Sequence, residues 1–438
     1  MTLFSRRPSR WFPFMCSIPL LLQASCAAGG PETAAGQQMK LIVTETSLGP
    51  IDHPANQVVS TTISPDARHI MYARQVSGAQ CLVVDGRTVG SYDEVYADYF
   101  SPDGARIAYR ARRGTSWRIG LDGVESAEYA RVRPVVFSRD SKHYAYAASR
   151  AGKWFAVLDG QEGRQYDDVD ELTLSADGSH FAYCAKRGDA NFTVKDGQEG
   201  PKYRSIRCCA LSPDGSHFAY CAKRGEKGFV VLDGREGPPY DGVGLCTFSP
   251  NSRRLAYIAK QGSQGFWVVD GGEGKRYDDG GVGPFMVFSA DSEHVAYTAM
   301  RADGWLVVKD GVEGQGGYVC ETQHPLAQIV LSADGVHLAY CAPKWDKWVV
   351  VRDGIESKDY NVVTCPAFGP DGKHLAYFAR RSSQSGLFLV VDGTGSSKEY
   401  SNRLPYEPHI VFDSSTEFHT IASRGEEAYL VTGKIVWR

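Results

Sequence analysis

The chain has 438 residues, a formal net charge of −3, 11% aromatic residues and 47 glycines. A charge this close to zero, with no tail of like charges, gives no reason to expect a nucleic-acid partner. Length alone would allow two or three domains, but a regular repeat overrides that estimate because its copies stack into one body.

The first 28 residues have the layout of a secretory signal peptide. Three arginines form a positive start, a mostly apolar run covers residues 11–22, and small residues follow at 24–28. The run is too short to span a bilayer comfortably. We therefore expect an exported protein, periplasmic or secreted, with no transmembrane segment. Residues 29–39 are expected to form a flexible leader.

Two processing routes remain open for this signal. Cleavage after Ala27 or Ala28 would release a soluble protein, whereas lipidation would make Cys26 an anchored N-terminus. Bacterial lipoprotein signals usually carry Leu three residues before that cysteine, and this chain has Gln23 there. Soluble release is therefore favoured slightly over a lipid anchor.

The rest of the chain is built from copies of one short unit. Residues 179–188 and 216–225 have the same ten-residue sequence, 37 positions apart. A Ser-Pro-Asp-Gly element, or a degraded form of it, begins at Ser64, Ser101, Ser138, Ser175, Ser212, Ser249, Ser289, Ser332, Gly369 and Asp413. An Asp-Gly pair follows 21 residues after eight of these starts and 23 residues after the ninth. The chain therefore contains about ten copies of one supersecondary unit, each 37 to 44 residues long.

Each unit is expected to form four short antiparallel strands. In the fifth unit we predict strands at 208–211, 217–222, 229–232 and 239–243, separated by the Ser-Pro-Asp-Gly turn, a Lys-Arg-Gly turn and an Asp-Gly hairpin. No 3.6-residue apolar period appears, which argues against helices. Four antiparallel strands in a unit of this length are typical of one blade of a β-propeller, an all-β fold.

Ten blades would exceed the usual range of roughly four to eight. No connection between copies is long enough to be a linker between two rings, so we expect one ring of about ten four-stranded blades over residues 40–438, not two five-bladed rings. Either an extra strand at 41–44 or a final fourth strand at 434–437 would close this ring.

Two stretches carry a resemblance to a known repeat. Phe-Ser-Pro-Asp-Gly at 100–104 with Ile-Ala-Tyr at 107–109, and Phe-Ser-Pro at 248–250 with Leu-Ala-Tyr at 255–257, resemble the WD-repeat-like propeller repeat of bacteria, found in TolB-type proteins. The resemblance runs from about residue 58 to the end and implies the fold, not a reaction. We expect no counterpart of the mixed α/β domain that precedes the propeller in TolB-type proteins. The Trp-Asp pair at 345–346 falls in an expected turn, unlike the pair that ends a strand in true WD repeats.

Candidate binding residues gather on one face of the expected propeller. In an antiparallel blade, the turn between the second and third strands and the connection to the next blade lie at the same end. Basic residues of these turns are Lys186, Arg187, Lys223, Arg224, Arg380 and Arg381. They would attract an anionic partner, unless aspartates of the neighbouring connections neutralise them locally.

Three connections on this face are longer than the others, and loops held on a rigid scaffold often carry binding residues. The longest carries Tyr318, Glu321 and His324. The last carries Arg403, Tyr406 and His409. We expect a binding site for a protein or an anionic envelope component near this rim.

One position of the unit, five residues after its start, is histidine in seven copies: His69, His143, His180, His217, His294, His337 and His374. A shared metal ion is not expected, because zinc ligands lie about 2.1 Å from one centre whereas packed sheets lie about 10 Å apart. Each histidine is instead expected beside the turn aspartate of its own blade, as His217 beside Asp214. We expect no metal and no cofactor.

Nine of the eleven cysteines lie beyond the signal. Cys184, Cys221 and Cys341 share one position of the unit, which predicts small buried strand residues with parallel Cβ directions. Successive copies should then not bridge each other easily. The disulfide we would look for is Cys209–Cys221, on neighbouring strands of one blade.

These patterns favour an exported, monomeric, non-enzymatic scaffold that binds a protein or an envelope component. The alternative is a propeller-type glycan lyase or hydrolase using carboxylates, or His324 and Tyr318, at the central opening. Short catalytic motifs such as Gly-x-Ser-x-Gly are missing from the sequence. Inward positions of the first strands are largely apolar or small, as at 135–137 and 329–331, which favours the scaffold.

Overall fold

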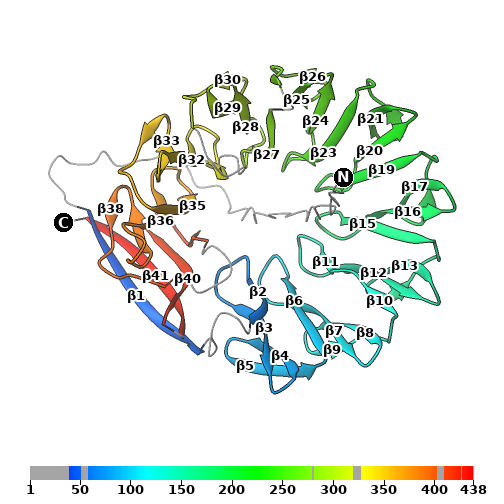
Figure 1. Ribbon diagram of the computed structural model, residues 1–438, viewed down its shortest axis with the longest axis horizontal. Coiled ribbons are helices and arrows are strands. Elements are labelled where there is room, and N and C mark those ends of the chain that lie inside the picture. Colours follow the sequence, from blue (N-terminus) through cyan, green and yellow to red (C-terminus); the bar gives the residue numbers. More distant parts are fainter. Residues whose placement is uncertain are drawn as a thin grey trace, which may run out of the picture. The chain divides into compact units, whose positions relative to one another are not determined.

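The computed structural model describes residues 39–50, 58–278, 281–318, 327–401, 409–425 and 427–437. The regular elements of these residues are β-strands, β1 to β41, coloured along the chain in Figure 1. Nothing in the described ranges forms a helix that is both long and apolar enough to cross a bilayer.

The strands form ten antiparallel sheets, numbered along the chain. Sheet 1 contains β2 (Val58–Ile63), β3 (Ile70–Val76), β4 (Ala79–Val84) and β5 (Arg87–Tyr92). Sheet 2 contains β6 (Glu94–Phe100), β7 (Ile107–Arg113), β8 (Ser116–Leu121) and β9 (Val124–Glu125). Sheet 3 contains β10 (Arg131–Val132), β11 (Val136–Phe137), β12 (Tyr144–Arg150), β13 (Lys153–Leu158) and β14 (Gln161–Glu162). Sheet 4 contains β15 (Asp168–Leu174), β16 (Phe181–Arg187), β17 (Ala190–Lys195) and β18 (Gln198–Glu199).

The next three sheets repeat this order. Sheet 5 contains β19 (Ser205–Leu211), β20 (Phe218–Arg224), β21 (Lys227–Leu232) and β22 (Arg235–Glu236). Sheet 6 contains β23 (Gly242–Phe248), β24 (Leu255–Gln261), β25 (Gln264–Val269) and β26 (Gly272–Glu273). Sheet 7 contains β27 (Val282–Phe288), β28 (Val295–Arg301), β29 (Gly304–Lys309) and β30 (Val312–Glu313).

The last three sheets complete the set. Sheet 8 contains β31 (Ala327–Leu331), β32 (Leu338–Lys344), β33 (Lys347–Arg352) and β34 (Ile355–Glu356). Sheet 9 contains β35 (Val362–Phe368), β36 (Leu375–Arg380), β37 (Phe388–Val391) and β38 (Thr394–Gly395). Sheet 10 contains β39 (Val411–Phe412), β40 (Glu417–Arg424), β41 (Glu427–Trp437) and β1 (Met39–Pro50).

The third-to-fourth-strand hairpin of sheet 5 explains where its strands lie. Asp233 and Gly234 have φ values of 49° and 79°, in the left-handed region that a tight two-residue hairpin requires. The fourth strand therefore starts immediately after this turn, as β22. The prediction of a fourth strand at 239–243 was wrong in its bounds: Tyr240 pairs with Gly228 of the third strand, but the end of that range already belongs to β23.

The first strand of sheet 3 is divided into β10 and β11, which both pair with β12. Pro134 lies between them. Proline has no N–H to give to the ladder, so an interruption of the strand at this residue is expected.

Hydrophobic clusters join every pair of consecutive sheets in the described part of the chain. Between sheets 4 and 5, for example, Ala182 packs with Tyr203, Phe218 and Val231. The tenth cluster brings Ile421 of sheet 10 against sheet 1. Each sheet thus packs on the next and the last packs on the first. The chain is a ten-bladed β-propeller.

The strand from the N-terminal side closes this ring. β1 pairs antiparallel with β41 from Met39 opposite Trp437 to Pro50 opposite Glu427, so it is the outermost strand of sheet 10. The predicted strand at 41–44 is therefore the closing one. The prediction of a separate fourth strand at 434–437 was wrong, because these residues end the third strand of that sheet.

Candidate functional site

Because neighbouring strands in each sheet are antiparallel, the turns and connections of a sheet lie at two opposite ends. We call the end with the first-to-second and third-to-fourth turns the turn face. The end with the second-to-third turns and the connections between sheets is the loop face. Among the candidate residues that the structure describes, Tyr318 and the basic residues of the second-to-third turns lie toward the loop face.

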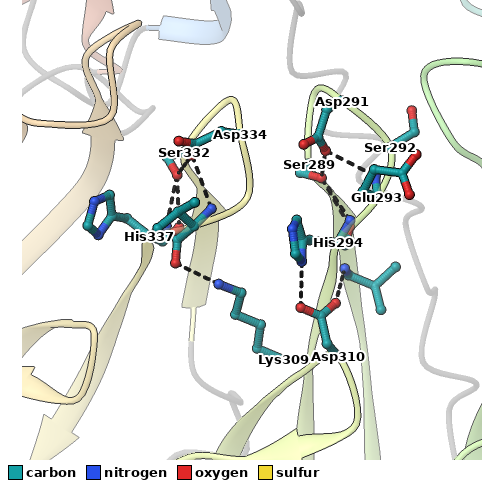
Figure 2. Close-up of polar contacts among 12 residues, drawn as sticks. Ser289, Asp291, Ser292, Glu293, His294, Lys309, Asp310, Ser332, Asp334 and His337 are labelled. Carbon is teal, nitrogen blue, oxygen red and sulfur yellow. Dashed lines mark hydrogen bonds and ion pairs between the residues drawn. The ribbon is translucent and has the colours of Figure 1, made fainter.

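The side chains of the turn face hold the turns and the neighbouring sheets together, as Figure 2 shows for sheets 7 and 8. Ser332 Oγ donates to Asp334 (2.5 Å) and accepts the His337 N–H (2.9 Å). The Asp291 N–H of sheet 7 donates to the Ala333 carbonyl of sheet 8 (3.2 Å). Lys309 Nζ donates to the Val336 carbonyl of the same neighbouring turn (2.7 Å). These polar groups are thus occupied within the propeller.

The carboxylates of two of these turns, in sheets 4 and 5, are stabilised in their ionised form. In sheet 5 the hydroxyl groups of Ser212 and Ser216 donate to Asp214, at 2.7 Å each. These bonds hold the pKa of Asp214 well below its usual range, and the first turn of sheet 4 has the same effect on Asp177. The Asp214 N–H donates to Ser252 Oγ of sheet 6 (3.0 Å). These aspartates build turns and do not form an acid–base pair.

The histidines of the unit pair with a different aspartate from the one predicted. His217 Nδ1 lies 2.7 Å from Oδ2 of Asp233 in the third-to-fourth turn, so its expected place beside Asp214 was wrong. Oδ1 of Asp233 accepts the Phe218 N–H (2.9 Å), which ties this turn to the second strand. The other six pairs are His69–Asp85, His143–Asp159, His180–Asp196, His294–Asp310, His337–Asp353 and His374–Asp392. Within the described residues, no group of three or more His, Cys, Asp or Glu side chains could hold a metal ion.

The basic residues of the loop face are largely bound within their own sheets. Arg187 pairs with Glu199 (2.8 Å) and lies 5.2 Å from the centre of the Tyr166 ring. Arg224 and Arg381 are placed in the same way, by Glu236 and Tyr203 and by Glu399 and Phe388. Each guanidinium thus joins the end of the second strand to a carboxylate of its own sheet and to an aromatic ring, which for Arg187 and Arg224 pairs with the third strand of the preceding sheet. This arrangement gives a structural reason for the repeated arginine.

The remaining basic residues differ in exposure. Lys186 is exposed, Lys223 lies 3.9 Å from Glu226, and Arg380 is half-buried at the end of β36. The connections also bring carboxylates to the loop face, since Lys153 pairs with Asp167 and Lys227 with Asp241, at 2.6 Å each. Local neutralisation of the loop face by these aspartates is therefore visible in sheets 3 to 6.

The predicted rim residues fall into two groups. Tyr318 is 6% exposed and packs on the Tyr340 ring (6.1 Å between centres), so the structure places it in the interface between sheets 7 and 8. His409 approaches the Ser64 carbonyl of sheet 1 through Nε2 (3.2 Å), and burial lowers its pKa. Both residues thus hold sheets together. Glu321, His324, Arg403 and Tyr406 lie outside the described residues.

Two carboxylates of the first strands, Asp98 and Glu171, depart from the apolar pattern expected there. Asp98 of β6 forms a two-pronged pair with Arg110 (2.7 and 2.8 Å), whose guanidinium lies 4.8 Å from the Tyr96 ring centre. Glu171 of β15 accepts the Cys209 N–H of sheet 5 (3.3 Å). Asp98 and Arg110 satisfy each other, and Glu171 bonds the backbone of the neighbouring sheet.

Among the described residues of the loop face, the most exposed large apolar side chain belongs to a residue that was expected in a turn but not as a candidate for binding. Trp345 lies in the turn between β32 and β33 and is 94% exposed. Its φ is 58°, in the left-handed region that a bulky residue rarely adopts. The same turn position is glycine in five other sheets, with φ between 58° and 62°, and it is Ser77 and Ala151 in sheets 1 and 3, with φ of 48° and 50°; the glycines are Gly114, Gly188, Gly225, Gly262 and Gly425. Aligning the ten units would have revealed a tryptophan at a position where other units have glycine, serine or alanine.

The turn around Trp345 is fixed at both ends. Lys344 Nζ lies 2.6 Å from Glu356 and 4.0 Å from Asp359, while Lys347 donates to the Asn361 side chain. These bonds tie the second and third strands to the fourth strand and to the connection that follows it. The indole therefore projects from a turn that is held in place.

Comparison with known proteins adds little to this geometry. The sequence matches no family model and no curated protein. The solved structures that it matches include a eukaryotic initiation factor, at 12% identity and a TM-score of 0.45, over 82% of this chain and 97% of that chain. TolB from Acinetobacter baumannii matches at 22% identity and a TM-score of 0.29, over 48% and 63% of the two chains.

A third structure, the β-propeller domain of the trilobed protease from Pyrococcus furiosus, matches at 12% identity and a TM-score of 0.33, over 60% and 96% of the two chains. Propellers are thus among the matched structures, as the repeat resemblance implied. At these identities and TM-scores the matches carry no argument about activity or partners.

Proposed function

We propose that the protein is an exported, non-enzymatic scaffold that binds a partner protein through its loop face, with Trp345 at the contact. One observation carries this proposal. A tryptophan occupies a left-handed turn position that is glycine in five other sheets, serine in sheet 1 and alanine in sheet 3, and its side chain lies almost wholly in solvent. The left-handed backbone costs a residue with a Cβ about 1 kcal/mol relative to glycine. Because the indole is exposed, its packing in the free protein does not offset this cost. Strained backbone conformations of this kind are often found at functional sites.

Protein is favoured over an anionic polymer as the partner. Tryptophan is among the residues that contribute most to protein interfaces. A polyanion would need free cationic groups, whereas Arg187, Arg224 and Arg381 already pair with glutamates. The turn face is a poorer candidate, because its polar side chains hold the sheets together.

Export is supported by two independent features. The sequence begins with a positive start and a short apolar run. The Cys184–Cys209 disulfide would persist in an oxidising compartment and is uncommon in a reducing cytosol. Sequencing the N-terminus of protein recovered from the cell envelope tests this part, because an unprocessed Met1 terminus would contradict it.

The binding proposal is tested with Trp345→Gly. Glycine suits this turn, so the variant should fold and melt at least as high as the wild type. Partners captured on immobilised wild-type protein from an envelope extract are purified, and their dissociation constants are measured with wild type and variant. We expect at least about 30-fold weaker binding for Trp345→Gly, the loss typical of a central interface tryptophan.

Ile355→Ala is the matched control. Ile355 belongs to the same sheet and is 76% exposed, but it follows the third-to-fourth turn and so lies at the turn face. Its substitution should leave binding unchanged. Equal affinity of wild type and Trp345→Gly for every captured protein, or retention of glycans alone, would contradict the proposal.

A further inference from the structure

Three cysteine side chains meet at the interface between sheets 5 and 6. Cys221 of β20 and Cys246 of β23 have their sulfur atoms 3.3 Å apart. Both belong to the hydrophobic cluster that joins the two sheets, together with Cys208 of β19. Cys221 is buried, whereas Cys246 keeps some exposed surface.

The neighbouring interface already contains a disulfide at the same two positions of the unit. Cys184 of sheet 4 is bonded to Cys209 of sheet 5, at a sequence separation of 25. Cys221 and Cys246 are also 25 residues apart and occupy the corresponding places in sheets 5 and 6. The expected Cys209–Cys221 pair was therefore wrong. Successive copies were not expected to bridge easily through their second strands, but Cys184 is bonded to a cysteine on the first strand of the next sheet.

The backbone explains why these two positions approach each other. The first strands of sheets 4, 5 and 6 each have a bulge, with a left-handed residue at Glu171, Cys208 and Leu245 (φ 54°, 57° and 54°). The bulge shifts the register, so the next residue leaves the regular ladder. At the interface of sheets 6 and 7 the same two positions are Ile258 and Met286, which pack in that cluster. The site is thus a regular side-chain contact of this propeller.

Cys208 is the competing partner for Cys221, but it occupies the bulge position, which is Glu171 in sheet 4 and Leu245 in sheet 6, and not the position of the bonded Cys209. The Cys208 sulfur accepts the Leu245 N–H of sheet 6 (3.3 Å). Contacts with neighbouring thiol groups and burial raise the pKa of Cys208 and also that of Cys221, so the choice of partner rests on the geometry shared with the Cys184–Cys209 disulfide. Thiolate is the attacking species in disulfide formation. Cys246 is partly exposed whereas Cys221 is buried, so Cys246 is the more accessible of these two cysteines to an external oxidant.

We propose that Cys221 and Cys246 form a second inter-sheet disulfide, so that two successive crosslinks join sheets 4, 5 and 6. The oxidant is a small-molecule disulfide. The Cys246 thiolate attacks it, forms a mixed disulfide and releases one small thiol. The Cys221 thiolate then attacks the Cys246 sulfur and releases the second thiol. The protein loses two electrons and two protons, and the oxidant takes up both as two thiols.

The sulfur atoms need to approach by about 1.3 Å to reach the bonded distance of about 2.05 Å. The reaction depends on the folded geometry of sheets 5 and 6, not on the function of the loop face. Its test is therefore independent of the binding proposal.

The test maps the disulfides of the folded full chain. Protein purified with reductant is transferred to oxidised glutathione, its remaining thiols are alkylated, and it is digested with trypsin without reduction. We expect one species in which peptide 208–223 is joined to 165–186 and to 236–253, with Cys208 alkylated. Recovery of 236–253 as a single alkylated peptide, or of 208–223 with an internal disulfide to Cys208, would overturn the proposal.

Two variants make the assignment specific. Cys246→Ser should release the serine form of peptide 236–253 and leave 165–186 joined to 208–223. Cys81→Ser removes a free cysteine of sheet 1 and should leave the three-peptide species intact. Disappearance of that species in Cys81→Ser, or its persistence in Cys246→Ser, would also contradict the proposed pairing.

Discussion

The aspartate of each third-to-fourth turn does two things with one carboxylate. One carboxylate oxygen accepts a hydrogen bond from a backbone N–H of the second strand. The other oxygen contacts the side chain of the residue five positions after the start of the unit. That partner is histidine in seven sheets, while Arg106 and Arg254 make the same contact with Asp122 and Asp270. The carboxylate is thus the constant part of this contact within the chain. Its partner can be either histidine or arginine.

The sequence contains the spacing of this pair but not its geometry. Histidine at the fifth position and Asp-Gly after 21 residues are both visible in the printed chain. The nearer aspartate, Asp214, was the natural guess for His217. Only the register of the hairpin, in which Ala219 lies opposite Leu232, brings Asp233 back beside His217. Register depends on the turn and on packing, which local propensity does not specify.

His374 gives this pair a pH dependence. Its side chain is 12% exposed, and its Nδ1 lies 2.6 Å from Asp392. The hydrogen bond to Asp392 raises its pKa above the ordinary 6.5, with Asp371 adding to the effect and burial and Arg352 opposing it. The folded state therefore favours the protonated ring. This stabilisation is fully present below the unfolded pKa and is lost as pH rises through the folded pKa.

We expect His374→Gln to lower the guanidinium midpoint of unfolding more at about pH 5.5 than at about pH 9. His217→Gln is the comparison, because the 45% exposed side chain of His217 is better screened by solvent and its loss should have a smaller effect. An equal loss for His374→Gln at both pH values, or a larger loss at the higher one, would contradict this assignment.

At the scale of the strands, some positions are packed so closely that only glycine, which has no Cβ, fits there. In β41, a Cβ on Gly433 would lie 2.1 Å from Cζ of Phe418, a ring that is 1% exposed. Gly433 pairs with both β1 and β40, so it lies in the middle of the sheet that closes the propeller. A side chain at this position would force the ring or the strand to move.

Gly433→Ala should therefore destabilise the protein by about 1 to 3 kcal/mol, the usual cost of overpacking a core. Gly244→Ala is the control, because a Cβ there meets no atom within 4 Å. The readout is the guanidinium midpoint of each variant. A midpoint for Gly433→Ala at or above that of Gly244→Ala would show that the ring of Phe418 does not need this glycine.

The strands themselves were largely predictable from the sequence. The Ser-Pro-Asp-Gly and Asp-Gly turns locate the second and third strands of each unit, because turn residues set φ directly. The fourth strand was placed too late in sheet 5, since a two-residue hairpin leaves no room for a loop before it. Tyr318 was misleading for another reason. It lies in a longer connection but keeps the tyrosine position of the unit, opposite Trp305.

At the scale of the whole molecule, the sequence indicates the number of sheets because each unit carries its own turn signals. It does not indicate which sheets meet, since that depends on contacts between residues far apart in the chain. Arg68 of sheet 1 and Asp413 of sheet 10 form such a contact, with 2.9 Å between Nη2 and Oδ1. Glu45 of β1 and Lys398 form another, at 3.1 Å.

The central claim is one closed ring, in which sheet 10 packs on sheet 1. Zero-length carbodiimide coupling of Arg68→Lys tests it most directly, because it joins an amine to a carboxylate only when they touch. We expect a crosslinked peptide pair between position 68 and Asp413, absent in Arg68→Lys with Asp413→Asn. The Lys398–Glu45 crosslink serves as the positive control. Detection of that control without any crosslink from position 68 to Asp413 would contradict the closed ring.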